Sequence, residues 1–224
     1  MKPIEQIHEF LNWFFLQGVH AFDIHIRKPK TPNEDYKTGN WIWLTHNENI
    51  TLKYIQNKML SWIKYENSNG ADIYFRPYKD GVHPVIFLDD IPINNALKIA
   101  KKYTACIIET SLNNTQVWLS TNNPLDKSSR KAAQILLKDK GYSDPGSISG
   151  DHLGRLCGVK SHKHGSWVNL IQTSTVKPYL PDLKKSQSYI SPPTYVANNH
   201  IKRSTKSNQK TAQNIGGGGV CFTN

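Results

Sequence analysis

The feature that most constrains this chain is the run Val85-Ile86-Phe87-Leu88-Asp89-Asp90, in which four large apolar residues lead directly into two carboxylates. An unbroken apolar run of this length predicts a central strand that is buried on both faces. Such a strand accommodates two ionised aspartates only at its end, where they find a partner. A divalent cation is one such partner. On spacing alone, a strand exit with two solvated turn residues is the simpler interpretation.

The charge balance of the 224-residue chain indicates the kind of partner it binds. Lys and Arg number 28 against 17 Asp and Glu, which gives a net charge of +11. This excess suits a polyanion such as nucleic acid or nucleotide phosphates. We find no signal peptide and no apolar run that could span a bilayer, so we predict a cytoplasmic protein without a membrane partner. The cysteines Cys106, Cys157 and Cys221 form no CxxC pair, so neither a structural zinc site nor a disulfide framework is expected.

Hydrophobic periodicity predicts helices interleaved with strand pairs. Four helices are predicted, and the first covers residues 4–19. The second is capped by Asn47 or Asn49 and ends near Ile63. The third covers 92–103, and the fourth covers 127–139 with Asp126 as its cap. Predicted strands include a half-buried one at Phe22–Ile26, followed by 41–44, 72–77, 85–90, 106–110, 116–119 and 167–171. The loop 78–84 is expected to close a hairpin between its flanking strands. The pattern predicts an α+β fold with an antiparallel or mixed sheet and helices on one side.

The periodic pattern stops near residue 180, which predicts two parts. Residues 1–180 are expected to form the folded domain. From 181 to 224 six Lys or Arg stand against the single Asp182, and large apolar residues are scarce. Such a segment cannot bury enough apolar surface to offset its ordering entropy. We therefore expect a flexible basic tail.

A second unusual stretch is the loop 141–164, which is long for a connection inside a compact domain. Long loops of this kind more often serve function than packing. The loop contains the isolated carboxylate of Asp144, imidazoles and several cations, and the alternative interpretation is an ordinary solvated basic loop. Its candidate residues are Asp144, His152, Arg155, Lys160, Lys163 and His164.

Taken together, several motifs resemble the RepB-type primases of plasmid replication, which belong to the archaeo-eukaryotic primase superfamily. The similarity covers roughly residues 8–172. The motifs occur in the same order and at similar spacing as in that family. They are Gly70-x-Asp72-Ile73-Tyr74-Phe75-Arg76-Pro77, Phe87-Leu88-Asp89-Asp90, Glu109-Thr110-Ser111, Gln116-x-Trp118, Asp144-Pro145 and His152-x-Gly154-Arg155-Leu156-x-Gly158. The resemblance implies an RRM-like catalytic core and a template-dependent polymerase that starts chains de novo on single-stranded DNA.

The resemblance also implies roles for individual residues. Asp89, Asp90 and Asp144 match the three catalytic, metal-binding aspartates. Carboxylate oxygens are the ligands that Mg²⁺ or Mn²⁺ prefers, and paired ions suit nucleotidyl transfer from nucleoside triphosphates. The resemblance further implies nucleotide-phosphate contacts for His152, Arg155 and Lys160. Arg76 is a further candidate for this pocket and equally a candidate for a salt bridge, whereas Lys163 and His164 are expected to be simple surface charge. Glu109 and Trp118 are expected to be scaffold, and Trp41 or Trp43 is either core or a stacking platform for a template base.

Two differences from the superfamily pattern stand out. Many members carry two aspartates separated by one residue, whereas adjacent Asp89 and Asp90 point to opposite faces of a regular strand. We therefore expect a bulge or a strand end at Asp90 that redirects one of them. In addition, the compared primases carry a C-terminal helical domain important for priming, where this chain has the short basic tail.

The sequence leaves competing functions open. The leading one is a primase of a plasmid or other mobile replicon, with single-stranded DNA and nucleotides as partners and a helicase or initiator as a further candidate partner. A nicking initiator that uses two histidines and a tyrosine is disfavoured, because His162 and His164 lack the preceding strand and no tyrosine is placed for it. A noncatalytic single-strand-binding replication protein is the alternative, and metal dependence would separate it from the primase.

Overall fold

The computed structural model describes residues 1–30, 41–142 and 144–184. The helical segments are α1 (Pro3–Leu16), α2 (Leu52–Tyr54), a π-helical turn (Ile55–Met59), α3 (Leu60–Ser68), α4 (Ile93–Lys102), α5 (Lys127–Lys138) and a 3-10 turn (Pro145–Ser147). The strands are β1 (Ala21–Pro29), β2 (Trp41–Thr51), β3 (Asp72–Pro77), β4 (His83–Pro92), β5 (Ala105–Ser111), β6 (Asn114–Leu125), β7 (Gly154–Arg155), β8 (Lys160–Ser161), β9 (Ser166–Trp167) and β10 (Asn169–Thr173).

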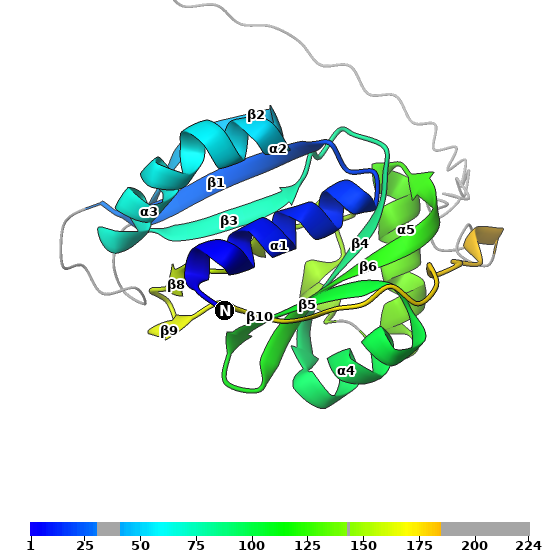
Figure 1. Ribbon diagram of the computed structural model, residues 1–224. Helices are drawn as coiled ribbons and strands as arrows, with labels where there is room; N and C mark the ends of the chain where they lie inside the picture. The colour runs from blue at the N-terminus through cyan, green and yellow to red at the C-terminus, as the bar shows by residue number, and fades with distance from the viewer. Residues whose placement is uncertain (31–40, 143, 185–224) are drawn as a thin grey trace, which may run out of the picture. The chain divides into compact units, whose positions relative to one another are not determined.

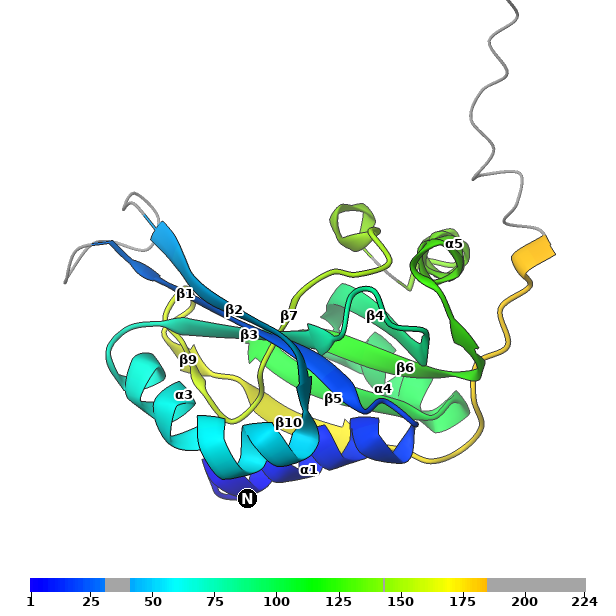
Figure 2. The ribbon, with the colours of Figure 1, turned by 90° about the horizontal axis from the view of Figure 1, so that it is seen from above.

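These strands form two antiparallel four-stranded sheets and one small ribbon. The first sheet has the order β2-β1-β3-β7, the second has the order β10-β5-β6-β4, and β8 pairs with β9. Helix α1 runs along both four-stranded sheets, while α4 and α5 lie beside the second sheet (Figures 1 and 2). The predicted α+β class with antiparallel sheets is confirmed. The expectation that the helices lie on one side was wrong, because α1 covers one face of the second sheet while α4 and α5 cover the other.

Strand β4 is buried on both faces, as its sequence predicts. Val85 and Phe87 belong to the core that α1 shares with both sheets. Ile86 and Leu88 face the other way, into the core beneath α4 and α5. Along the chain the elements follow the order β4-α4-β5-β6-α5. In the sheet, β6 lies between β4 and β5, which is a split β-α-β arrangement. The end of β4 therefore lies where two cores and two sheets meet.

Aromatic side chains join α1 to both sheets. The ring of Phe14 lies 4.9 Å from that of Phe75 on β3 and 5.1 Å from that of Trp118 on β6. Trp118 in turn lies 4.5 Å from Phe87 on β4, and all four rings are almost fully buried. The two contacts of Phe14 are edge-to-face and the contact of Phe87 with Trp118 is tilted, and aromatic pairs of this kind add to the free energy of apolar burial. Trp118 is thus scaffold, as expected.

Three local expectations were wrong, and each has a physical reason. The loop 78–84 closes no hairpin, because β3 and β4 belong to different sheets. Strand β2 continues past Asn47 and Asn49, so the following helix is capped by Thr51, whose Oγ1 accepts a hydrogen bond from Tyr54 N. Strand β1 is buried on both faces around Asp23, because the buried polar side chain there is neutralised by an ion pair.

The structure also bears on the predicted cap of α5, on the cysteines and on membrane-spanning helices. Asp126 caps α5 by accepting from Ser129 N, as predicted. Cys106 and Cys157 are buried free thiols, and burial raises the pKa of each. Cys221 and the expected tail from residue 185 onward lie outside the described residues. No helix within the described ranges is long and apolar enough to cross a membrane.

Histidine 83, at the start of β4, should make stability depend on pH. It is only 8% exposed, and burial, followed by the charge of Arg130, lowers its pKa from 6.5 to about 3. Between these values the unfolded chain binds a proton that the folded chain does not. The free energy of unfolding should therefore fall as the pH drops through this window, by up to ~1.4 kcal/mol per pH unit from this one group.

The measurement is urea unfolding between pH 7 and pH 4 of the wild type, His83→Gln and the exposed control His20→Gln. We expect His83→Gln to lose less stability on acidification than the wild type, and the control to follow the wild type. Aspartates with lowered pKa, such as Asp126, contribute equally to all three proteins and cancel in the comparison. Parallel pH profiles for the wild type and His83→Gln would contradict the assignment.

Candidate active site

The two adjacent aspartates lie in a β-bulge at the end of β4. The pairing of β4 with β6 shifts register between Leu88 and Ile91, so Asp89 and Asp90 lie within the irregularity. Asp90 has a φ of 53°, a left-handed conformation that Asp and Asn tolerate better than most residues. The bulge expected from their adjacency is therefore present. It allows both side chains to line the same pocket instead of pointing to opposite faces.

Amide side chains from β6 hold these carboxylates. Asp89 Oδ1 accepts from Asp90 N at 2.9 Å and from Gln116 Nε2 at 3.1 Å. Asp90 Oδ1 accepts from Asn114 Nδ2 at 2.7 Å. Gln116 also reaches the first sheet, because its Oε1 accepts from Arg155 N at 2.8 Å. Gln116 therefore fixes the distance between Asp89 and β7, and it ties together the two sheets that flank the pocket.

The electrostatics of the pair favour a cation. Burial, followed by the charge of Asp90, raises the pKa of Asp89. The hydrogen bonds from Gln116 and Asp90 N, together with His152, oppose that rise. A divalent ion with oxygen ligands would neutralise the pair and remove the cause of the raised pKa. The residues present fit such an ion, since the pocket offers carboxylate and amide oxygens and contains no cysteine among its lining residues.

His152 lies directly above the buried strand. Its ring stacks on Phe87 with centroids 5.5 Å apart and an interplanar angle of 11°, and its Nε2 lies 4.0 Å from Asp89 Oδ2. The neighbouring Gly154 allows this close approach. A Cβ at that position would lie 2.6 Å from Trp118 Cζ2 and 2.9 Å from Phe87 Cε2. The His-x-Gly part of the motif thus places an imidazole at the pocket wall.

Arg155 lies on β7 and lines the same pocket while its side chain is almost buried. Its Nη1 is 3.1 Å from Asp72 Oδ2, and its guanidinium lies over the ring of Tyr74 at 5.1 Å. The register Tyr74↔Arg155 between β3 and β7 produces this stacking. Asp72 and Tyr74 therefore fix the guanidinium plane, which a planar, multidentate donor needs in order to bind an anion specifically.

Asp144 lies beside the pair through its backbone. Its N–H donates to Asp89 O at 3.4 Å, while its carboxylate accepts from Gly146 N at 2.8 Å and begins the 3-10 turn. The Asp144 side chain is not among the groups that line the pocket. The structure thus brings the three predicted aspartates together as neighbours, with two of their carboxylates in one pocket.

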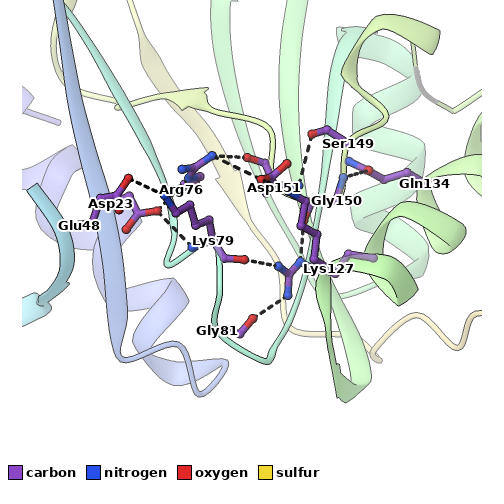
Figure 3. Close-up of polar contacts among 11 residues, drawn as sticks. Asp23, Glu48, Arg76, Lys79, Gly81, Lys127, Gln134, Ser149, Gly150 and Asp151 are labelled. Carbon is purple, nitrogen blue, oxygen red and sulfur yellow. Dashed lines mark hydrogen bonds and ion pairs between the residues drawn. The ribbon is translucent and has the colours of Figure 1, made fainter. Parts of the chain in front are cut away.

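The remaining predicted phosphate contacts lie elsewhere. Lys160, on β8, is exposed, and its backbone pairs with the side chain of Asn67. Lys163 and His164, which we expected to be simple surface charge, line the pocket instead. Arg76 does not line it. Arg76 Nε binds Asp23 Oδ2 at 2.9 Å, and its Nη1 donates to Asp151 O at 2.7 Å (Figure 3).

Arg76 belongs to a polar network that connects the first sheet to α5. Asp151 Oδ2 lies 2.6 Å from Lys127 Nζ, and Gln134 Oε1 accepts from Gly150 N at 2.8 Å (Figure 3). Gln134 Nε2 donates to Phe87 O at 2.8 Å, which ties the same segment to β4. This network holds residues 149–151, and it thereby holds the chain that leads into His152.

One further group of metal-ligating side chains occurs among the described residues. Ligand atoms of Asp23, His25 and Glu48 lie within 4.8 Å of one another. Asp23 already accepts from Arg76 Nε, and Glu48 binds Lys79 Nζ at 2.9 Å, which lowers the pKa of Glu48. Cations of the chain itself compensate these carboxylates. The group is therefore an ion-pair network rather than a second candidate metal centre.

Sequence reasoning missed several residues of the pocket. Gln116 belongs to the Gln116-x-Trp118 motif, but its role as a bridge between the sheets depends on pairings of distant strands. Asn114 carried no distinguishing signal beyond being polar, whereas Lys163 and His164 were candidate residues of the loop 141–164 that we expected to be surface charge. Arg155 forms its ion pair with Asp72, which lies in the Gly70–Pro77 motif. The sequence linked Arg155 to Asp72 only through the resemblance to the RepB-type primases, in whose motifs both residues occur.

Solved structures identify this fold as that of a primase catalytic domain. The catalytic domain of primase RepB′ in complex with initiator DNA matches with a TM-score of 0.66 at 22% identity, covering 85% of this chain and 96% of that one. The structure of primase RepB′ itself gives a TM-score of 0.65 at 22% identity, covering 84% and 63%. The AEP domain of the cyanophage S-2L primase-polymerase gives 0.52 at 12% identity, covering 82% and 96%.

Sequence comparison identifies the family. The model of the RepB DNA-primase N-terminal domain matches residues 32–180, so the chain belongs to that family. Mobilization protein A of Escherichia coli is 28% identical over 148 residues, which are 65% of this chain and 19% of that protein. The chain thus spans about a fifth of this relative and 63% of primase RepB′. The sequence-based recognition of a RepB-type primase is confirmed.

Proposed function

We propose that this chain is a DNA-directed primase, a nucleotidyltransferase that makes short primers on single-stranded DNA during replication of a plasmid or other mobile replicon. The observation that carries the proposal is the bulge at the end of β4, which puts both Asp89 and Asp90 into one pocket of a chain from the RepB primase family. A bulge that gives Asp90 a φ of 53° is costly for a structural strand end and useful for a site that needs paired carboxylates.

Each part of the proposed site has a defined task. Asp89 and Asp90, with Asp144 beside them, would hold Mg²⁺ or Mn²⁺, and an ion bound there would supply the positive charge that favours attack by a 3′-hydroxyl and departure of pyrophosphate. Arg155, oriented by Asp72 and Tyr74, binds triphosphate oxygens. His152 forms the wall of the pocket at 4.0 Å from Asp89. We assign the additional point charge to Lys163, which lines the pocket, in preference to Lys160 and Arg76.

The same proposal covers partners and organisation. The net charge of +11 supports binding of a single-stranded DNA template, and the related RepB′ catalytic domain is described in complex with initiator DNA. We propose residues 1–180, with an RRM-like core around β4, α4, β5, β6 and α5, as the catalytic domain, and 181–224 as a basic tail. We also propose that the protein acts in the cytoplasm, where a replicon and its helicase or initiator are available.

Incorporation of labelled nucleotides on single-stranded DNA tests the proposal. We expect the wild type to make products in Mg²⁺ or Mn²⁺ without a supplied primer, and to make none after chelation by EDTA. Extension of a supplied primer without de novo products would show a competent site that does not initiate. No incorporation under any condition, with single-strand binding intact, would replace the primase with the noncatalytic binding protein.

A further inference from the structure

A row of side chains crosses the first sheet on the face opposite its core. Phe22, Ile24 and Ile26 of β1 point into the core, and the alternate residue His25 lies on the other face. His25 is the register partner of Tyr74 on β3, and Tyr74 is that of Arg155 on β7. Trp43 of β2 completes the row, with its ring 6.2 Å from His25 and 5.3 Å from Tyr74.

The packing does not explain Trp43. It is 47% exposed, although an indole contributes more to stability in the core than at the surface. Trp43 instead lines a cavity together with Tyr74, His152 and Leu153. These last three residues also line the pocket of Asp89 and Asp90, so the two hollows adjoin along a shared wall. An exposed aromatic surface thus leads directly to the candidate active site.

The charges around this cavity favour a base over a phosphate. Arg76 lines the cavity, but Asp23 and Asp151 already bind its guanidinium. Asp151 also lines the cavity and is compensated by Lys127 at 2.6 Å. Among the described residues that line this cavity, the one Lys or Arg side chain, Arg76, already has carboxylate partners, which leaves little for a phosphate to bind. The indole and phenol rings offer a π surface, which any nucleobase can stack upon.

We propose that Trp43 and Tyr74 form a stacking site for an unpaired base of the single-stranded template as it enters the pocket of Asp89 and Asp90. This inference rests on the proposed primase function, because it takes that pocket as the destination of the strand. Stacking is tolerant of sequence, so the site would hold and orient the template without selecting a particular base.

Binding of a fluorescent oligonucleotide, measured by anisotropy in EDTA, tests the site without requiring activity. Trp43→Ala should weaken binding about tenfold, while Trp43→Phe, which keeps a ring, should remain within about threefold of the wild type. Trp167→Ala is the matched control, because Trp167 is 51% exposed but does not line either hollow. The dependence of binding on salt should have the same slope in all proteins, since no phosphate contact is removed.

Photocrosslinking detects direct contact between a base and a side chain. A residue with only a structural role would form no crosslink to the bound oligonucleotide. An oligonucleotide that carries 5-bromodeoxyuridine should crosslink to Trp43 or Tyr74, located by mass spectrometry of the peptides. Wild-type affinity for Trp43→Ala, or crosslinks confined to other elements, would overturn the stacking site even if the protein primes. Conversely, a wild type that incorporates no nucleotide would overturn the proposed function, while the binding and crosslinking results would still decide whether the bases stack here.

Discussion

Replacing Asp90 with Asn should abolish template-directed nucleotide incorporation. Loss of one of the two adjacent carboxylates that we propose as ligands of a divalent ion should raise the barrier by about 4 kcal/mol or more, which is a fall of about a thousandfold in rate. Asn is the sharper substitution than Ala, because it tolerates the φ of 53° at this position and can still accept from Asn114 Nδ2. The fold should therefore survive, so that lost activity reports on charge.

The measurement is single-turnover incorporation by Asp90→Asn beside the wild type. Asp139→Asn is the matched control, because Asp139 follows α5 at the surface, pairs with Lys138 and lies outside the pocket. Single-strand binding in EDTA should be unchanged in both variants. Mg²⁺ or Mn²⁺ should raise the melting temperature of the wild type and of Asp139→Asn but not of Asp90→Asn. Incorporation by Asp90→Asn at a tenth of the wild-type rate or more would refute its role as a ligand.

The strand at the centre of the fold was predictable because its signal is local. Val85 to Leu88 are apolar without interruption, and the two cores on either side of β4 require that composition. The bulge at Asp90 was predictable from a geometric conflict, since adjacent carboxylates in a regular strand cannot share a pocket. The assignment of β3 and β4 to different sheets was not predictable. A short polar loop such as 78–84 is equally compatible with a hairpin and with a crossing between sheets.

The candidate site was predictable where it follows the motifs and obscure where it depends on long-range pairing. His152 and Arg155 come from one short segment, and the Tyr74↔Arg155 register then fixes Arg155 over an aromatic ring. Lys163 rather than Lys160 lines the pocket because the β8–β9 ribbon directs the intervening turn toward it. Nothing in the spacing of these lysines indicates which side of the ribbon each one occupies.

The buried guanidinium of Arg130 is the second feature whose removal should have a large effect. Arg130 is 2% exposed and donates to four backbone carbonyls, those of Lys79, Gly81, Leu125 and Gly150, at 2.7 to 3.0 Å. It thereby connects α5 to the loop after β3 and to the segment before His152. Burial lowers the pKa of this guanidinium, whereas the charges of Asp151 and Asp126 raise it. Because an arginine stays protonated, the carbonyls take the place of water around a buried charge.

Replacing Arg130 with Met should therefore lower the free energy of unfolding by about 3–5 kcal/mol, which corresponds to a fall of roughly 10 °C in melting temperature. Met fills most of the volume of the Arg130 side chain, so little of the lost stability comes from a cavity. The loss arises mainly because the four backbone carbonyl oxygens stay buried without hydrogen-bond donors. Thermal unfolding of Arg130→Met, beside Lys131→Met on the exposed face of α5, measures the effect. A melting temperature within 2 °C of the wild type would mean that water replaces the guanidinium, and that Arg76, Lys127 and Gln134 are sufficient to hold the segment before His152.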